Sequence, residues 1–271
     1  MPHPSAKAER EKGARFHALH QRCFVIANAW DAGSARILAG LGFPALATSS
    51  GAHAGTLGRR DGQVTREEAL AHARAIVEAT DLPVSADFEH CFADEPAAAA
   101  ETIRLAAGVG LAGCSIEDAV GGKVYDFDLS VRRVAAAAQV ARPLHLVLTA
   151  RAENFLRGKP DLDDTIRRLQ AYEKAGADVL MAPGLPDLES VRKVCAALSK
   201  PFNFMAGIKG KSFSVAELQA AGVKRISLAS SLWRAAMSGM VDAAREVKEK
   251  GAFTYLERSL STPDISKFMQ E

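Results

Sequence analysis

One complete strand–helix–strand unit can be recognised in residues 84–118, VSADFEHCFADEPAAAAETIRLAAGVGLAGCSIED. It begins with a short apolar run at 84–88, continues through an alanine-rich helical pattern at 95–110 and returns to an apolar run at 113–118. Neither run alternates strictly with polar residues, which is typical of strands buried on both faces of a parallel sheet. Both runs end in carboxylates, so the unit also predicts a polar site at the strand ends.

The same alternation extends along the rest of the chain. Eight apolar runs are separated mostly by helical patterns, at 24–29, 45–49, 84–88, 113–118, 145–151, 179–183, 202–206 and 225–230. Several helical stretches end in Gly just before the next run, which marks a helix C-terminus. Eight repeats favour a closed (β/α)8 barrel of the TIM type over a doubly wound sheet, which usually has fewer strands and a Gly-rich first turn.

No linker or low-complexity stretch interrupts the 271 residues, so one domain spanning 1–271 is predicted. Beyond the eighth run, residues 232–271 are expected to form a C-terminal helical extension. It comprises a long helix over 231–253 and a shorter one in the tail, which is too amphipathic to remain in water.

The composition excludes several classes of partner. The net charge is only +2 and the basic residues are scattered, which argues against nucleic acid. No apolar run approaches the roughly 20 residues that cross a bilayer, and the N-terminus is charged where a signal peptide would be apolar. A cytoplasmic location is therefore expected, with the four cysteines as free thiols because no C-x-x-C pair is present.

Chemically active residues gather at the ends of the runs, where this fold builds its active sites. Asp87 and Glu89 end the third run, Glu117 the fourth and Arg151 the fifth. Oxygen ligands suit Mg²⁺ or Mn²⁺, and no His or Cys constellation competes for zinc. Each acid alone could cap a helix or pair with an arginine, but together they predict a divalent-metal site.

Residues at other run ends are candidates for substrate binding. The second run ends in Ser49, Ser50 and Gly51, and the seventh carries Asn203. Trp30 follows the first run, where it could wall a pocket or pack against the next helix.

Five segments together resemble the isocitrate lyase/phosphoenolpyruvate mutase superfamily. They are T-S-S-G-A-H-A-G-T-L-G-R-R-D (48–61), S-A-D-F-E (85–89), S-I-E-D (115–118), Lys123 and T-A-R (149–151). The resemblance covers almost the whole chain. It implies a Mg²⁺-dependent barrel enzyme that exchanges its C-terminal helix between subunits and forms homo-oligomers, as dimers of dimers.

The resemblance also implies the metal ligands. Asp87 matches the carboxylate that ligates Mg²⁺ directly. Asp61, Glu89 and Glu117 match acids that hold the water shell of the metal, with Glu89 in place of the family's second Asp.

The remaining matches concern the substrate. Arg151 matches the arginine that binds its carboxylate, and Ser49 and Ser50 match the turn that holds the other end of a 2-oxo acid. Lys123 matches a lysine of the mobile gating loop and would be catalytic with Arg151 and Glu117. An exposed loop lysine without a catalytic role is the open alternative.

Two departures from the family pattern bear on the reaction. The gating loop has K-V-Y-D-F (123–127), without the Cys that serves isocitrate and methylisocitrate lyases as an acid and base, so both activities are disfavoured. Tyr125 could supply a proton instead, whereas His90 and Cys91 are expected to shape the pocket. The sixth run ends in Met181-Ala182-Pro183-Gly184, where the phosphonate enzymes of the family have a His.

These features predict a Mg²⁺-dependent lyase of a small 2-oxo or 2-hydroxy acid resembling oxaloacetate. It would cleave a carbon–carbon bond or decarboxylate through a metal-stabilised enolate. Phosphorus–carbon chemistry and a non-catalytic 2-oxo acid-binding protein are the alternatives.

Overall fold

Eight parallel strands close into a barrel in the order β1-β10-β9-β8-β7-β4-β3-β2. They are β1 (Phe24–Asn28), β2 (Leu46–Ala47), β3 (Val84–Asp87), β4 (Gly113–Glu117), β7 (Val147–Arg151), β8 (Val179–Met181), β9 (Phe202–Met205) and β10 (Arg225–Ser227). Each lies within one of the eight predicted runs, which confirms the predicted (β/α)8 barrel. The structure, a computed structural model, describes residues 6–211 and 213–269, so 1–5, 212, 270 and 271 of the predicted domain lie outside the described residues.

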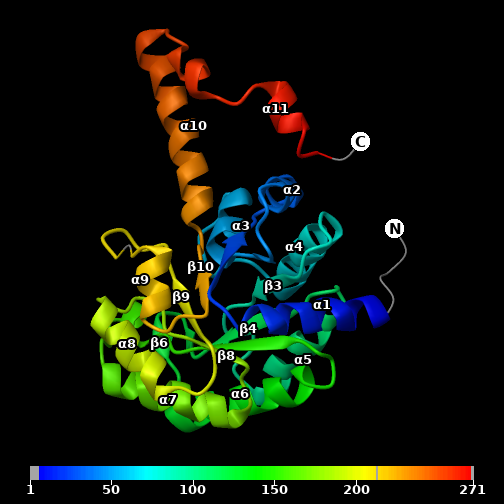
Figure 1. The fold of residues 1–271 in the computed structure, drawn as a ribbon, viewed down its shortest axis with the longest axis vertical. Helices are drawn as coiled ribbons and strands as arrows, with labels where there is room; N and C mark the ends of the chain where they lie inside the picture. The colour runs from blue at the N-terminus through cyan, green and yellow to red at the C-terminus, as the bar shows by residue number, and fades with distance from the viewer. Residues whose placement is uncertain (1–5, 212, 270–271) are drawn as a thin grey trace.

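Helices connect the strands and cover the outside of the barrel (Figure 1). They are α2 (Ala32–Gly40), α4 (Arg66–Glu78), α5 (Pro96–Ala107), α6 (Phe127–Ala141), α7 (Leu162–Ala175), α8 (Leu188–Ala197) and α9 (Val215–Ala220). Side chains fix where several of them begin. Thr65 and Glu68 form a capping box at the start of α4, which satisfies backbone N–H groups that the helix itself leaves unpaired.

The first helix, α1 (Ala6–Leu19), closes the end of the barrel at which the strands begin. Its Phe16 is fully buried and packs edge-on against Phe24 at the start of β1, with ring centroids 6.5 Å apart. This plug leaves the opposite end, where the strands finish, as the open end of the barrel.

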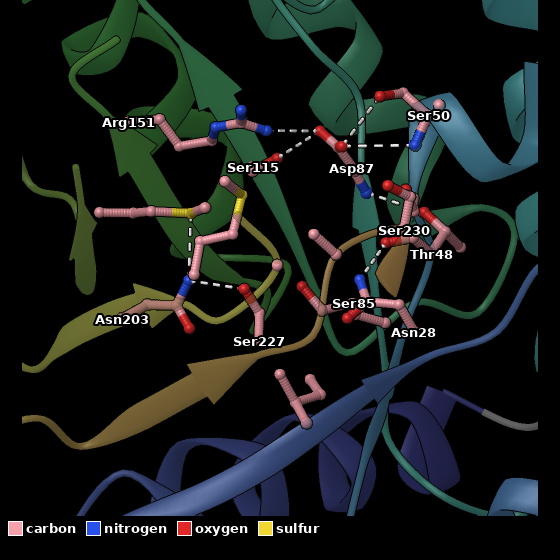
Figure 2. A pocket seen from close by; sticks show the side chains of 18 of the residues that line it. Asn28, Thr48, Ser50, Ser85, Asp87, Ser115, Arg151, Asn203, Ser227 and Ser230 are labelled. Atoms are coloured by element: carbon pink, nitrogen blue, oxygen red, sulfur yellow. Dashed lines mark hydrogen bonds and ion pairs between the residues drawn. The ribbon is translucent and has the colours of Figure 1, made fainter. Parts of the chain in front are cut away.

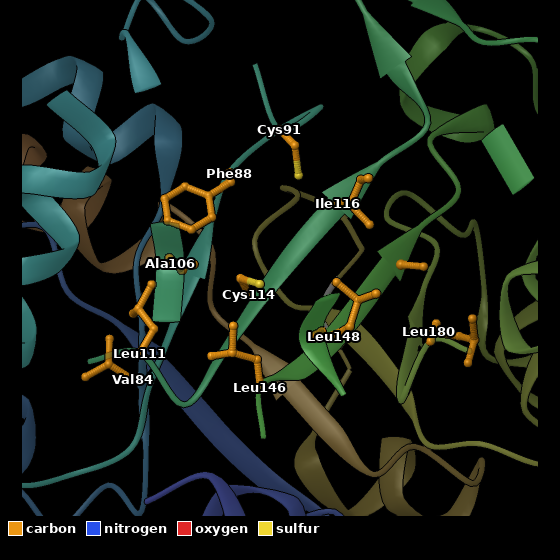
Figure 3. Close-up of a cluster of buried hydrophobic side chains, with 14 of the residues drawn as sticks. Val84, Phe88, Cys91, Ala106, Leu111, Cys114, Ile116, Leu146, Leu148 and Leu180 are labelled. Atoms are coloured by element: carbon orange, nitrogen blue, oxygen red, sulfur yellow. The ribbon is translucent and has the colours of Figure 1, made fainter. Parts of the chain in front are cut away.

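Alternation along each strand separates the core from the site. On β4, Ser115 faces the barrel interior (Figure 2), whereas Cys114 and Ile116 point outward into the apolar layer beneath the helices (Figure 3). Leu148 and Leu180 continue that layer along the neighbouring strands. Because successive strand residues point to opposite faces, the same segments supply both the core and the polar interior.

Four small elements lie near the open end and were not predicted. The two-residue strands β5 (Ala119–Val120) and β6 (Lys123–Val124) pair antiparallel and turn through Gly121 and Gly122. Both glycines have positive φ angles, of 54° and 82°, which other residues adopt only with strain. The helix α3 (Ser50–Thr56) follows β2, and the 3-10 helix η1 (Asn154–Arg157) follows β7.

The C-terminal extension projects from the barrel (Figure 1). Its long helix, α10 (Ser231–Lys250), has no buried residue. The tail forms a 3-10 helix, η2 (Thr254–Arg258), and α11 (Thr262–Ser266) rather than one shorter helix. Pro263 accounts for the break, because proline is tolerated in a first helical turn but cannot continue a preceding helix. No helix within 6–211 or 213–269 is long and apolar enough to cross a membrane.

Candidate active site

A cavity of about 310 Å³ opens at the carboxyl ends of the strands (Figure 2). Seven residues singled out from the sequence line it, namely Ser49, Ser50, Gly51, Asp61, Asp87, Arg151 and Asn203. They come from four different strands or the loops that follow them, so closure of the barrel is what brings them together.

Asp87, the last residue of β3, binds side chains on both sides of it. Its Oδ1 accepts hydrogen bonds from Arg151 Nη1 at 2.9 Å and from Ser115 Oγ at 3.3 Å. Its Oδ2 accepts from the hydroxyl and the amide of Ser50, at 3.1 and 3.4 Å. Burial alone would raise the pKa of Asp87, but Arg151 and these hydrogen bonds outweigh it and hold the pKa below its ordinary value. The carboxylate is therefore ionised.

Arg151 connects Asp87 to two further acids. Its guanidinium lies 3.0 Å from Glu117 Oε2 and 2.8 Å from Glu153 Oε1. Arg157 of η1 reaches Glu117 Oε1 at 3.2 Å. Burial raises the pKa of Glu117, and the charges of Glu153 and Asp87 add to that effect while Arg151 opposes it. Three carboxylates therefore share two guanidinium groups in a largely buried network.

Glu89 and Asp61 lie on the other side of Asp87. Burial, followed by the charges of Asp87 and Asp61, raises the pKa of Glu89 to about 7. The Asp61 carboxylate lies so close to Gly51 that a Cβ atom on that glycine would be 3.3 Å from Asp61 Oδ2. Asp61 and Asp87 are thus both close enough to Glu89 to repel its negative charge.

The four acids do not form one ready-made cluster. Among the described residues, no group of three or more His, Cys, Asp or Glu side chains is placed to hold a metal ion. Glu117 faces the two arginines instead of the other acids. Carboxylate oxygens such as those of Asp87, Asp61 and Glu89 are the type of donor that suits a hard cation.

Arg133 of α6 fixes the loop that carries Glu89. Its side chain is 1% exposed and donates to the backbone carbonyls of His90, Ala93 and Asp94. Glu89 itself has a φ of 50°, a conformation that costs energy in a residue other than Gly. The arginine thus stabilises a loop that would not hold this shape through local preferences alone.

The residues singled out from the sequence that are not among the described residues lining the cavity include Trp30, Glu89, His90, Cys91, Glu117, Lys123 and Tyr125. Lys123 is exposed in the β5–β6 hairpin. The Tyr125 hydroxyl donates to Asp94, and burial together with this bond raises its pKa, so it is a poor proton donor. Cys91 is fully buried, and burial raises the pKa of its thiol well above the ordinary value, so it is no nucleophile.

Several residues of the site were not predicted. Ser115 could have been found, because it lies two positions before Glu117 on the same strand face. Arg225 was visible as a charged residue inside an apolar run. The sequence did not indicate that Arg157 belongs to the site, because the position of this side chain depends on the short helix η1.

This arrangement can be compared with known proteins. The family model described as phosphoenolpyruvate phosphomutase matches residues 16–248. The chain belongs to this family. It is thereby a member of the isocitrate lyase/phosphoenolpyruvate mutase superfamily, which confirms the resemblance, and its relatives are lyases and mutases.

Individual family members agree over most of their length. A crystal structure of a Burkholderia cenocepacia J2315 protein, provisionally named a lyase/mutase, is 46% identical with a TM-score of 0.94, covering 97% of this chain and 96% of that one. A probable 2-methylisocitrate lyase of Corynebacterium glutamicum is 30% identical over 92% of this chain and 84% of its own. An oxaloacetate decarboxylase of Ectopseudomonas mendocina is 28% identical over 93% and 89%.

Proposed function

We propose that this member of the family is a Mg²⁺-dependent carbon–carbon lyase of a small 2-oxo or 2-hydroxy acid resembling oxaloacetate. The observation that carries the proposal is the ionised carboxylate of Asp87, flanked in one cavity by Arg151 and Ser50. Binding of such a substrate requires two things: a protein carboxylate that can hold the cation, and hydrogen-bond donors that can hold the carboxylate of the substrate. The cavity volume of about 310 Å³ suits a small acid.

The acids of the site fit Mg²⁺, or Mn²⁺ in its place. Asp87 would hold the cation directly, and Asp61, Glu89 and Glu117 would hold it through water. The raised pKa of Glu89 reflects repulsion from Asp87 and Asp61 in addition to burial, and a divalent cation would relieve that repulsion. A cation bound there supplies the positive charge that stabilises an enolate.

Different side chains around Asp87 bind different parts of the substrate. Arg151 binds the carboxylate of the substrate, and its contacts with Glu117 and Glu153 keep the guanidinium in place. Ser49, Ser50 and Gly51 hold the other end of the 2-oxo acid. Binding of the substrate would exclude water from this cavity, whose side chains are already largely buried.

The residues farther from Asp87 favour cleavage next to the carbonyl group. Met181 and Met205 line the cavity on β8 and β9, and neither side chain carries an acidic proton that could be transferred to the substrate. Cys91, the cysteine nearest to Asp87 in the sequence, is buried, and burial raises the pKa of its thiol. Decarboxylation requires the least additional acid–base chemistry, which is why an oxaloacetate-like substrate is proposed. The oxaloacetate decarboxylase relative supports this choice.

The C-terminal extension supports a homo-oligomer, proposed as a dimer of dimers. Met240, Val247 and Phe253 are 58%, 37% and 58% exposed on α10 and just after it. Apolar side chains of this size on a projecting helix are typical of an interface. Exchange of α10 and α11 between subunits would cover them.

Product analysis tests the proposed function. Purified protein is incubated with Mg²⁺ and a panel of 2-oxo and 2-hydroxy diacids, and pyruvate release is followed. No turnover by a folded, metal-loaded sample would reject the lyase. A changed phosphorus NMR spectrum with phosphonopyruvate would support phosphorus–carbon chemistry instead, and tight binding of 2-oxo acids without turnover would indicate a binding protein.

A further inference from the structure

Arg225 at the start of β10 has its guanidinium inside the barrel. The residue is 5% exposed, and its hydrogen bonds within the described part of the chain are to neutral groups. Nε donates to Asn203 Oδ1 at 2.9 Å, and Nη2 donates to Thr149 Oγ1 at 2.8 Å. Nη1 lies 3.4 Å from Nε2 of His20, whose Nδ1 is bonded to a backbone carbonyl. These bonds leave part of the donor capacity of the guanidinium unused.

A buried arginine without a carboxylate is unusual. Arg151 and Arg168 pair with acids, and the buried Arg133 donates to three backbone carbonyls. Arg225 pairs with no acid among the residues that the structure describes. Burial lowers its pKa to about 9, so it still carries its charge at neutral pH. Burying an unpaired charge is unfavourable unless a partner offsets the lost hydration.

The cavity that contains Asp87 also reaches Arg225. Arg225, Asn203 and Ser227 line it together on the side away from Asp87. Figure 2 shows Asn203 and Ser227 across the cavity from Asp87 and Arg151. Asn203 and Arg225 are register partners on adjacent strands. The hydrogen bond from Arg225 occupies Oδ1 of Asn203, and Nδ2 of Asn203 donates to Met181 Sδ at 3.0 Å and to Ser227 Oγ at 3.3 Å. An anion would therefore take the amide donor over from one of these two weak or long contacts.

We propose that Arg225, Asn203 and Ser227 form an anion subsite for the second carboxylate of a dicarboxylic acid. The first carboxylate lies beside Asp87 and Arg151, so this inference rests on the proposed function. A carboxylate is the partner that Arg225 lacks, and it can accept from a guanidinium, an amide and a hydroxyl together. A purely apolar occupant would leave the charge unpaired. The site therefore selects diacids over monoacids of equal length.

The unmodified protein gives the first test. In the presence of Mg²⁺, calorimetry compares 2-oxoglutarate with 2-oxopentanoate, which has the same chain length but a methyl group in place of the second carboxylate. We expect the diacid to bind at least about tenfold more tightly, or about 1.4 kcal/mol. Equal affinities, or tighter binding of the monoacid, would overturn the subsite.

Variants then locate the effect. Arg225→Met removes the charge at similar volume, and should abolish the diacid preference while the affinity for 2-oxopentanoate changes less than about twofold. Ser227→Ala, a smaller change in case Arg225→Met does not fold, should reduce the preference about threefold. Arg22→Met, at an exposed arginine before β1, should leave it unchanged. A preference retained in a folded Arg225→Met protein would refute the assignment.

Turnover distinguishes this inference from the proposed function. Diacid preference without pyruvate release would reject the lyase and keep the subsite. Pyruvate release without diacid preference would keep the lyase and reject the subsite.

Discussion

Arg151 and Asp87 form an ion pair inside the cavity, with Nη1 2.9 Å from Oδ1. Arg151 is the last residue of β7 and Asp87 is the last residue of β3, and β4 lies between these two strands in the barrel. Both side chains are largely buried, so the attraction between them is screened far less than at the surface. The pair keeps Asp87 ionised, which is the form that a divalent cation requires.

Removing the charge of Arg151 should destabilise the protein. Arg151→Met leaves Asp87, Glu117 and Glu153 without their shared cation, and loss of one partner of a buried pair costs about 3–5 kcal/mol. Urea unfolding measures this loss. Arg157→Met is the matched control, because Arg157 is 31% exposed and should cost less. Equal losses in the two variants would contradict the central position of Arg151.

Arg133 should control the loop that carries Glu89. Without its bonds to the carbonyls of His90, Ala93 and Asp94, residues 88–95 should exchange amide hydrogens faster. Because Glu89 is proposed to hold the water shell of the metal, Mn²⁺ affinity should fall about 10–100-fold in Arg133→Met. Hydrogen exchange and Mn²⁺ titration check both effects. The control is Arg132→Met, at the neighbouring, exposed arginine. Identical amide hydrogen exchange of residues 88–95 in the two variants would disprove that Arg133 holds this loop.

The buried histidines His20 and His72 should each lower stability on mild acidification, against the opposite contribution of the raised carboxyl pKa values of Glu89 and Glu117. Burial, helped by Arg225, lowers the pKa of His20 to about 3, and burial with His53 lowers that of His72 to about 4. The unfolded chain titrates these groups near 6.5, so below that pH it binds more protons than the folded chain. The contribution of these two histidines to the free energy of unfolding is absent above pH 7 and becomes unfavourable from about pH 6.5 downward, by roughly 2 kcal/mol per histidine at pH 5.

Urea unfolding at pH 7.5 and at pH 5 measures this loss. Relative to the unmodified protein, His20→Gln should be favoured at pH 5 over pH 7.5 by roughly 2 kcal/mol, the contribution of one histidine. If that variant loses as much stability between the two pH values as the unmodified protein, the buried histidine is not the cause.

The exposed face of α10 should hold subunits together. Met240 and Val247 lie seven positions apart on one side of this helix, and burying each such side chain stabilises by about 1.5–3 kcal/mol. Met240→Glu combined with Val247→Glu should therefore reduce the mass measured by light scattering, whereas Lys248→Glu on the same helix should not. A monomeric unmodified protein would be incompatible with the proposed oligomer.

The repeated apolar runs were sufficient to predict the barrel and its eight strands, because burial on both faces leaves a clear pattern. The pattern could not show how the tail breaks at Pro263 or that Lys123 lies in a paired hairpin, since both depend on turns of a few residues. Sequence also placed Asp87 and Arg151 at strand ends that meet in the cavity. It could not show that Glu117 turns toward Arg157, because ion pairing across elements is decided by packing.

Oxalate binding tests the central claim most directly, because oxalate resembles the carboxylate and oxo group of a 2-oxo acid but contains no bond to cleave in this way. Its affinity is measured by calorimetry with Mg²⁺ and with chelator, for the unmodified protein and for Asp87→Asn, with the exposed Asp128→Asn as control. The account predicts binding at least about tenfold tighter with Mg²⁺, a difference that Asp87→Asn abolishes and Asp128→Asn retains. Equal affinity with and without Mg²⁺, or an unchanged Mg²⁺ effect in Asp87→Asn, would contradict a metal-assisted 2-oxo acid site centred on Asp87.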